Sequence, residues 1–208
     1  MNNYKKNYTM LIAAIVLLVV STSICSADPI SLMSGSLSAG NGLETGGSWG
    51  DNTSISWTVT LIDNSYWHYE YTFTSNVSPS LSHFILQVSD NFTNEQFWNL
   101  SNNLIPELKT HYEDDRANPG MPADIYGIKL EGFSEELTET FSFDSSRVPM
   151  WGSFYAKAAR DTYAFNTGLN NGLDFISVPD TNTVPVPGAA ILGMIGIFIA
   201  GKKLRKYA

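Results

Sequence analysis

Cysteine is almost absent from this chain of 208 residues, whose single cysteine is Cys25. One cysteine cannot form a disulfide within the chain, so the fold must be stabilised by its hydrophobic core alone. Cys25 also lies in an N-terminal segment that has the features of a secretory signal. After removal of that segment the protein contains no thiol, which excludes catalysis by a cysteine nucleophile.

Basic residues are also scarce, and half of the 12 lie near the two ends of the chain. These six are Lys5, Lys6, Lys202, Lys203, Arg205 and Lys206. All 20 acidic residues lie between Asp28 and Asp180, which leaves six basic against 20 acidic residues there, a net charge of −14. Such a charge argues against nucleic acid or anionic membrane surfaces as partners, and it favours solubility.

Motifs for catalysis or metal binding are lacking too. No serine sits in a G-x-S-x-G sequence, and the histidines His68, His83 and His111 form no H-E-x-x-H motif. The alternation of its strand places His68 on the polar side, in contact with solvent, and His83 is expected to be a strand-edge or structural residue. The run from His111 to Asp115 lacks the spacing of a calcium loop, which favours a solvated acidic loop but leaves calcium binding open. We therefore expect no enzyme, no cofactor and no catalytic or metal-ligating residue, although the many carboxylates leave a glycosidase pair possible.

Long hydrophobic runs are missing, and the N-terminal apolar stretch is too short to span a bilayer. The segment combines Lys5 and Lys6, an apolar run at residues 10–20 and a polar stretch at residues 21–26. This order is that of a secretory signal peptide, here residues 1–27, with cleavage between Ala27 and Asp28. The competing interpretation is a lipoprotein acylated on Cys25, for which Ile24 is a poor preceding residue.

The middle of the chain has the alternation of β-strands. One apolar series is Ile55, Trp57, Val59 and Leu61, and a second is Trp67, Tyr69, Tyr71 and Phe73. Because residues 63–65 are Asp-Asn-Ser, which favour turns, the two series predict a hairpin. The aromatic series on the second strand is expected to face the core.

Further strands are predicted at residues 84–88, 151–156 and 163–165, with a second hairpin formed by residues 125–133 and 137–143. Residues 93–100 predict one short helix, with Thr93 as its N-cap and Gln96 closing a capping box. Residues 102–123, which contain three prolines, predict a long surface loop. The fold class expected for residues 28–178 is therefore all-β, a single sandwich of Ig-like or jelly-roll type.

The aromatic content allows two interpretations. The chain has five tryptophans, ten tyrosines and 11 phenylalanines, which could form either the core or a sugar-stacking surface. Most are expected in the core of a domain without disulfides. Trp49 and Trp151 lie beside glycines, and this turn-like context predicts that they are exposed.

The C-terminus has three parts in a fixed order. Residues 179–187 form a proline-containing linker, residues 188–201 are uncharged, and residues 202–208 are a basic tail. The 14 residues of the middle part make about 21 Å of helix, against about 30 Å for the hydrocarbon core, so the predicted transmembrane helix is short. The basic stop, formed by Lys202, Lys203, Arg205 and Lys206, indicates a cytoplasmic end with the domain outside. A permanent anchor without processing remains an alternative, as does a buried core helix.

This C-terminus resembles a PEP-CTERM sorting signal. The residues that carry the resemblance are Pro185, Val186, Pro187 and Gly188, followed by the apolar run and the basic tail. Val186 stands where the family usually has Glu, a variation that the family accommodates. The resemblance implies processing by a membrane-embedded transpeptidase, an exosortase, in a bacterium with an outer membrane.

A combined hypothesis for function follows from these signals. The protein is expected to be exported, inserted transiently in the inner membrane by residues 188–201, and cleaved near Pro187. The resemblance implies a final location at the cell surface or in the extracellular matrix, with exopolysaccharide as a possible partner. There it would be a structural or adhesive component, or alternatively a carbohydrate-binding module or a secreted glycoside hydrolase.

Overall fold

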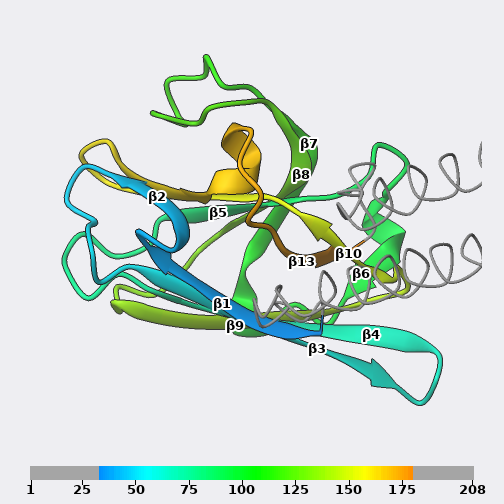
Figure 1. Ribbon diagram of the computed structural model, residues 1–208. Helices are drawn as coiled ribbons and strands as arrows, with labels where there is room; N and C mark the ends of the chain where they lie inside the picture. Colours follow the sequence, from blue (N-terminus) through cyan, green and yellow to red (C-terminus); the bar gives the residue numbers. More distant parts are fainter. Residues whose placement is uncertain (1–32, 180–208) are drawn as a thin grey trace, which may run out of the picture. The chain divides into compact units, whose positions relative to one another are not determined.

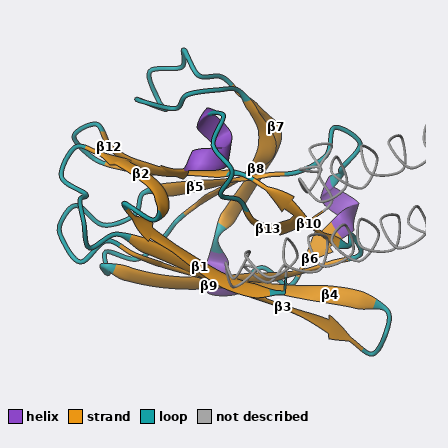
Figure 2. Ribbon diagram, in the orientation of Figure 1, coloured by secondary structure: helices purple, strands orange, loops and turns teal. Residues whose placement is uncertain are grey.

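The computed structural model describes residues 33–179, and these are organised almost entirely as β-strands (Figure 2). Within that range the helical residues form only three short 3₁₀ helices, Asn94–Gln96, Ser101–Asn103 and Thr167–Asn170. The strands are β1 Ser34–Ala39, β2 Gly42–Gly46, β3 Ser54–Ile62, β4 Tyr66–Thr74, β5 His83–Gln87, β6 Phe97–Trp98, β7 Ile105–His111, β8 Ile125–Glu131, β9 Thr138–Ser145, β10 Pro149–Gly152, β11 Phe154–Ala158, β12 Thr162–Asn166 and β13 Ile176–Pro179. The predicted all-β class is confirmed.

Eleven of the strands form one large curled sheet in the order β6-β9-β4-β3-β1-β2-β12-β11-β5-β8-β7. Its only parallel pair is β1 with β2, which join over just two residue pairs. We call the strands from β6 to β1 the first half and those from β2 to β7 the second half. The two halves lie one over the other (Figure 1), and β10 and β13 form a separate two-stranded sheet.

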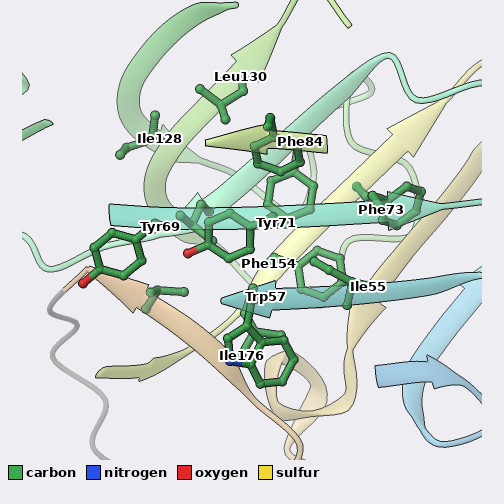
Figure 3. Packing of buried hydrophobic residues seen from close by; sticks show 14 of the residues in the cluster. Ile55, Trp57, Tyr69, Tyr71, Phe73, Phe84, Ile128, Leu130, Phe154 and Ile176 are labelled. Carbon is green, nitrogen blue, oxygen red and sulfur yellow. The ribbon is translucent and has the colours of Figure 1, made fainter. Parts of the chain in front are cut away.

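Aromatic side chains fill the space between the two halves (Figure 3). Phe84 of β5 stacks on Phe154 of β11 with 5.0 Å between ring centroids, and both belong to the second half. The same ring meets Phe141 of β9, in the first half, at 5.0 Å. Phe84 therefore joins the two halves at the centre of the core, where its side chain is fully buried.

The first predicted hairpin is confirmed. Strands β3 and β4 pair along their whole length, from Ser54 opposite Thr74 to Ile62 opposite Tyr66. Asp63 and Asn64 both have positive φ, at 48° and 53°, which short polar side chains tolerate in a tight hairpin turn. The aromatic face of β4 points inward as expected: Tyr69, Tyr71 and Phe73 are buried, and Trp67 packs against them in part.

The second predicted hairpin is wrong, although both of its strands exist. β8 lies between β5 and β7 in the second half, whereas β9 lies between β4 and β6 in the first half. The connection between them, residues 132–137, therefore crosses from one half to the other. An alternating pattern predicts a strand but does not identify its partner.

Several strands were missed because their sequences lack a strong alternation. The predicted loop at residues 102–123 contains β7, an edge strand in which Pro106 can be accommodated because its nitrogen makes no ladder hydrogen bond. The Gly/Ser-rich start of the domain contains β1 and β2. The predicted strand at residues 151–156 is two strands, β10 and β11, divided at Ser153.

The helix predicted at residues 93–100 is reduced to one 3₁₀ turn. The Thr93 N–H donates to Oε1 of Gln96 over 3.0 Å, which is the side-chain contact expected of a capping box. The turn ends at Gln96, and Phe97 and Trp98 continue as strand β6. Phe97 is buried against Phe143, so burial of this ring favours the extended chain.

The last described strand is held firmly in the core. All four residues of β13 are buried, and the strand pairs with β10 from Gly152–Ile176 to Pro149–Pro179. The Tyr71 hydroxyl donates to the backbone oxygen of Ser177 over 2.7 Å. The buried strand β13 thus extends to Pro179, the first residue of the predicted linker.

Candidate functional site

The residues predicted to direct export and sorting lie outside the described range 33–179. They are Ala27 and Asp28 at the signal cleavage site, Pro185, Val186, Pro187 and Gly188 in the sorting motif, and Lys202, Lys203, Arg205 and Lys206 in the basic stop. Within the described residues, no helix has the length and apolar character needed to cross a membrane. The candidate site described below therefore belongs to the β-domain.

The exposed tryptophan of this domain is not one of the two predicted. Trp49 is only 2% exposed, its Nε1 donates to the Pro79 oxygen over 2.9 Å, and its ring lies 4.9 Å from Phe73. Trp151 is half-buried and meets Trp57 edge-to-face. The prediction of exposure is therefore wrong for Trp49, because burial of its indole ring in the core outweighs the turn-like context of its glycine neighbours. The most exposed of the five tryptophans is Trp98, at 37%.

Four strands of the first half place one residue each in a row across the outer face of the sheet. Thr60 of β3 lies opposite His68 of β4, His68 lies opposite Asp144 of β9, and Asp144 lies opposite Trp98 of β6. Side chains of directly opposed residues share one face of a sheet. Because the neighbouring Tyr69 and Phe143 point into the core, this row faces outward.

A buried carboxylate organises the middle of this row. Asp144 is only 5% exposed, and each of its oxygens is hydrogen-bonded. Oδ1 lies 2.7 Å from Nδ1 of His68, and Oδ2 accepts from Nδ2 of Asn99 over 2.7 Å. Since Asp144 engages Nδ1, Nε2 is the His68 ring atom that can bind a ligand, and Asn99 retains its carbonyl oxygen as an acceptor.

Two aromatic rings stand beside these polar groups. The Tyr66 ring lies 5.6 Å from the Trp98 ring with their planes tilted by 59°. Tyr66 shares the outer face with His68, two residues further along β4. We call the group of Tyr66, His68, Trp98, Asn99 and Asp144 the outer-face site.

Hydroxyl groups continue the same face beyond this site. Thr72 and Thr140 are hydrogen-bonded across β4 and β9 at 2.9 Å, and Thr74 and Thr138 at 3.2 Å. The chemistry available is therefore stacking on an aromatic ring together with hydrogen bonding by fixed polar groups. Asp144 is buried and has both oxygens engaged, so its geometry suits orientation of His68 and Asn99 rather than proton transfer to a substrate.

A second row of aromatic rings lies on the outer side of the second half. Tyr155 and Tyr163 are nearly parallel at 6.4 Å, and Tyr163 and Phe165 at 6.1 Å. The loop at residues 112–124 covers this row: the Tyr155 hydroxyl donates to the Pro119 oxygen over 2.7 Å, and a Cβ on Gly120 would lie 2.2 Å from the Tyr163 ring. With Met121 these rings form a small second core, so the row is not an open platform.

The remaining histidines are buried in this second half. His83 of β5 is only 5% exposed, and burial lowers its pKa to about 4, with help from the positive charges of Lys129 and Lys157. Burial likewise lowers the pKa of His111. The expectation that His83 is structural agrees with its position. His68, expected in solvent, is 37% exposed but paired with Asp144.

The acidic loop that follows His111 uses its carboxylates within the loop itself. Asp115 Oδ1 accepts from the Ala117 N–H, and Asp124 Oδ1 accepts from the Glu113 N–H, each over 2.8 Å. Across residues 33–179, no three His, Cys, Asp or Glu residues are grouped so that they could hold a metal ion. These two hydrogen bonds hold the loop closed.

The outer-face site could not be found from the sequence, because its residues come from three strands and one turn that are distant along the chain. Asn99, with a positive φ of 52°, follows β6, a strand of two residues that no pattern predicted.

No protein-family model, no curated protein and no solved structure matches this chain.

Proposed function

We propose that this protein is exported, sorted through its C-terminus and released as a structural or adhesive component of the cell surface or exopolysaccharide matrix. The observation that carries the proposal is the order of sequence signals: a signal peptide at residues 1–27, a Pro-Val-Pro-Gly motif at residues 185–188, an apolar run and a basic tail. An exosortase is the partner that this order implies. The inner membrane holds the chain only until cleavage near Pro187.

The described domain supports this proposal in two ways. β13 is buried up to Pro179, so a linker attached there connects directly to a fixed strand of the core. The charge of −14 between Asp28 and Asp180 keeps such a domain soluble after release and weakens adsorption to anionic lipid. Both properties suit a protein that is tethered first and secreted afterwards.

We also propose that the curled sheet is a sandwich of jelly-roll type. Its support is the path of the chain, which passes between the first and second halves in each of the connections β4–β5, β5–β6, β6–β7 and β8–β9. Repeated crossings of this kind are typical of double-sheet jelly rolls. The aromatic contacts of Phe84 with both halves supply the shared core.

Replacing both Pro185 and Pro187 by alanine is expected to block processing in the native host. Without the prolines the segment before the membrane helix can become helical, and the cleavage site is no longer held extended. The full-length chain should then accumulate in the membrane fraction, measured by immunoblot after fractionation. The matched control, Asn182→Ala in the same linker, should be processed like the wild type. Normal release of the double-proline variant would contradict the proposed motif.

Carbohydrate binding is a second candidate function, and it is compatible with the first. The observation that favours it is the outer-face site, where the exposed Trp98 stands beside polar groups fixed by Asp144. A glycoside hydrolase has less support, because the carboxylate of this site is buried and hydrogen-bonded through both oxygens.

A further inference from the structure

We propose that the outer-face site binds an uncharged polysaccharide, with a sugar ring stacked on Trp98 and its hydroxyls hydrogen-bonded to His68 and Asn99. This ligand class makes the adhesive role proposed above more specific. It rests on that role in one respect only, the place at which the protein meets the polysaccharide.

A large aromatic ring is exposed on a surface that is otherwise mostly polar. Trp98 is 37% exposed, and Tyr66 lies 5.6 Å away at 59°, so the two rings present differently oriented faces. Polar side chains, among them Glu70 and Ser142, occupy most of the adjoining outward positions of β3, β4 and β9, and Ile62 lies opposite Tyr66. A protein partner would require a much larger apolar patch than two rings. A pyranose ring has one apolar C–H face and a polar rim, which matches an isolated aromatic ring bordered by hydrogen-bonding groups.

Asp144 fixes the polar groups of the site. A carboxylate that is 5% exposed costs free energy unless its oxygens are hydrogen-bonded, and here they bind His68 and Asn99. Both partners retain surface exposure, so the buried charge fixes two groups that remain accessible to a ligand. Fixing them before binding reduces the entropy lost when a ligand is held.

The charge of the surface favours an uncharged ligand. Glu70 is exposed on β4, two residues from His68 and on the same face of the sheet. Together with the domain's net charge of −14, it would repel uronate or sulfated polymers. A neutral hexose polymer avoids this repulsion, and its hydroxyls can donate to the Glu70 carboxylate.

The length of the polar face favours a long ligand. The Thr72–Thr140 and Thr74–Thr138 pairs extend the face by two further rows along β4 and β9. Successive rows on one face are about 7 Å apart. The surface therefore continues well beyond one sugar ring, which favours a polymer over a monosaccharide.

Biolayer interferometry with immobilised polysaccharides tests the proposal on the full-length chain in detergent, so that failed sorting in a host cannot affect the result. The probes are hydroxyethylcellulose and dextran as neutral polymers and alginate as the anionic one. We expect saturable binding to at least one neutral polymer and little to alginate. Trp98→Ala should weaken that binding at least about tenfold, since truncation of a central tryptophan removes the largest contact.

Two further variants separate binding from folding. Asn99→Gly tolerates the positive φ of 52° at this position, removes the amide group and should weaken binding several-fold. Tyr112→Ala removes another exposed aromatic side chain, 55% exposed in the loop at residues 112–124, and should leave binding unchanged. Failure of both neutral polymers to bind, unchanged binding by Trp98→Ala, or binding to alginate alone would each overturn the proposal. None of these results would bear on cleavage near Pro187, which the proline variants test separately.

Discussion

Phe84→Ala is expected to lower the free energy of unfolding by about 3–5 kcal/mol, the largest effect of any single substitution considered for this domain. The ring is fully buried and makes contacts in both halves of the sheet, with Phe154 on one side and Phe141 on the other, each at 5.0 Å. Its removal leaves a cavity at the junction of the halves. Since the domain has no disulfide, a loss of this size takes up a large part of an ordinary stability of about 5–15 kcal/mol.

Urea unfolding followed by tryptophan fluorescence measures this loss, with Leu173→Ala as the matched control. Leu173 is 89% exposed, so the same kind of truncation there should change the unfolding free energy by less than about 0.5 kcal/mol. A loss below about 1 kcal/mol for Phe84→Ala would mean that the two halves do not share the core described here.

The domain is expected to lose stability as the pH falls from 6.5 to 4, because His83 is buried in its neutral form. Burial lowers its pKa in the folded state from the ordinary 6.5 to about 4, so below pH 6.5 the unfolded chain binds a proton that the folded chain does not. The contribution of neutral His83 to the free energy of unfolding is fully present above pH 6.5. It decreases as the pH falls, until the pH passes below the folded pKa of about 4. The loss amounts to about 3 kcal/mol at most.

The groups around His83 act in both directions. Burial has the largest influence on its pKa and opposes protonation, as do the positive charges of Lys129 and Lys157. Glu131 and the side chain of Asn118 favour protonation but do not offset burial. Burial also lowers the pKa of His111, so this residue adds to the loss of stability at low pH. Thermal melts at pH 7.5, 6, 5 and 4 should therefore show a steep decline in the wild type and a shallower one in His83→Gln. Equal slopes in the two proteins would show that His83 is not the main cause.

Local signals in the sequence were sufficient for the first hairpin and insufficient for the sheet. The β3–β4 pair was predictable because alternation and a polar turn, Asp63-Asn64-Ser65, lie within one short stretch. The pairing of β8 and β9 could not be predicted, since each strand finds its partners in a different half and the choice depends on contacts such as Phe84–Phe141. Weakly patterned edge strands such as β7 were missed for the same reason: their neighbours in the sheet stabilise them.

The candidate site shows the same limit more clearly. Sequence context placed Trp49 at the surface because of its glycine neighbours, yet the ring is buried against Phe73. Trp98 becomes exposed because its neighbour Phe97 is the residue that enters the core. The contact of His68 with Asp144 joins residues 76 positions apart, and only the register of β4 with β9 brings them together.

The central claim is that the chain is exported and then cut at its C-terminal signal. Intact mass spectrometry of the protein from its native host, with membrane and medium analysed separately, tests this most directly. We predict a chain that begins at Asp28 and ends near Pro187, found in the medium or bound to matrix polysaccharide. A membrane-held chain that still ends at Ala208 would contradict processing and leave residues 188–208 as a permanent anchor.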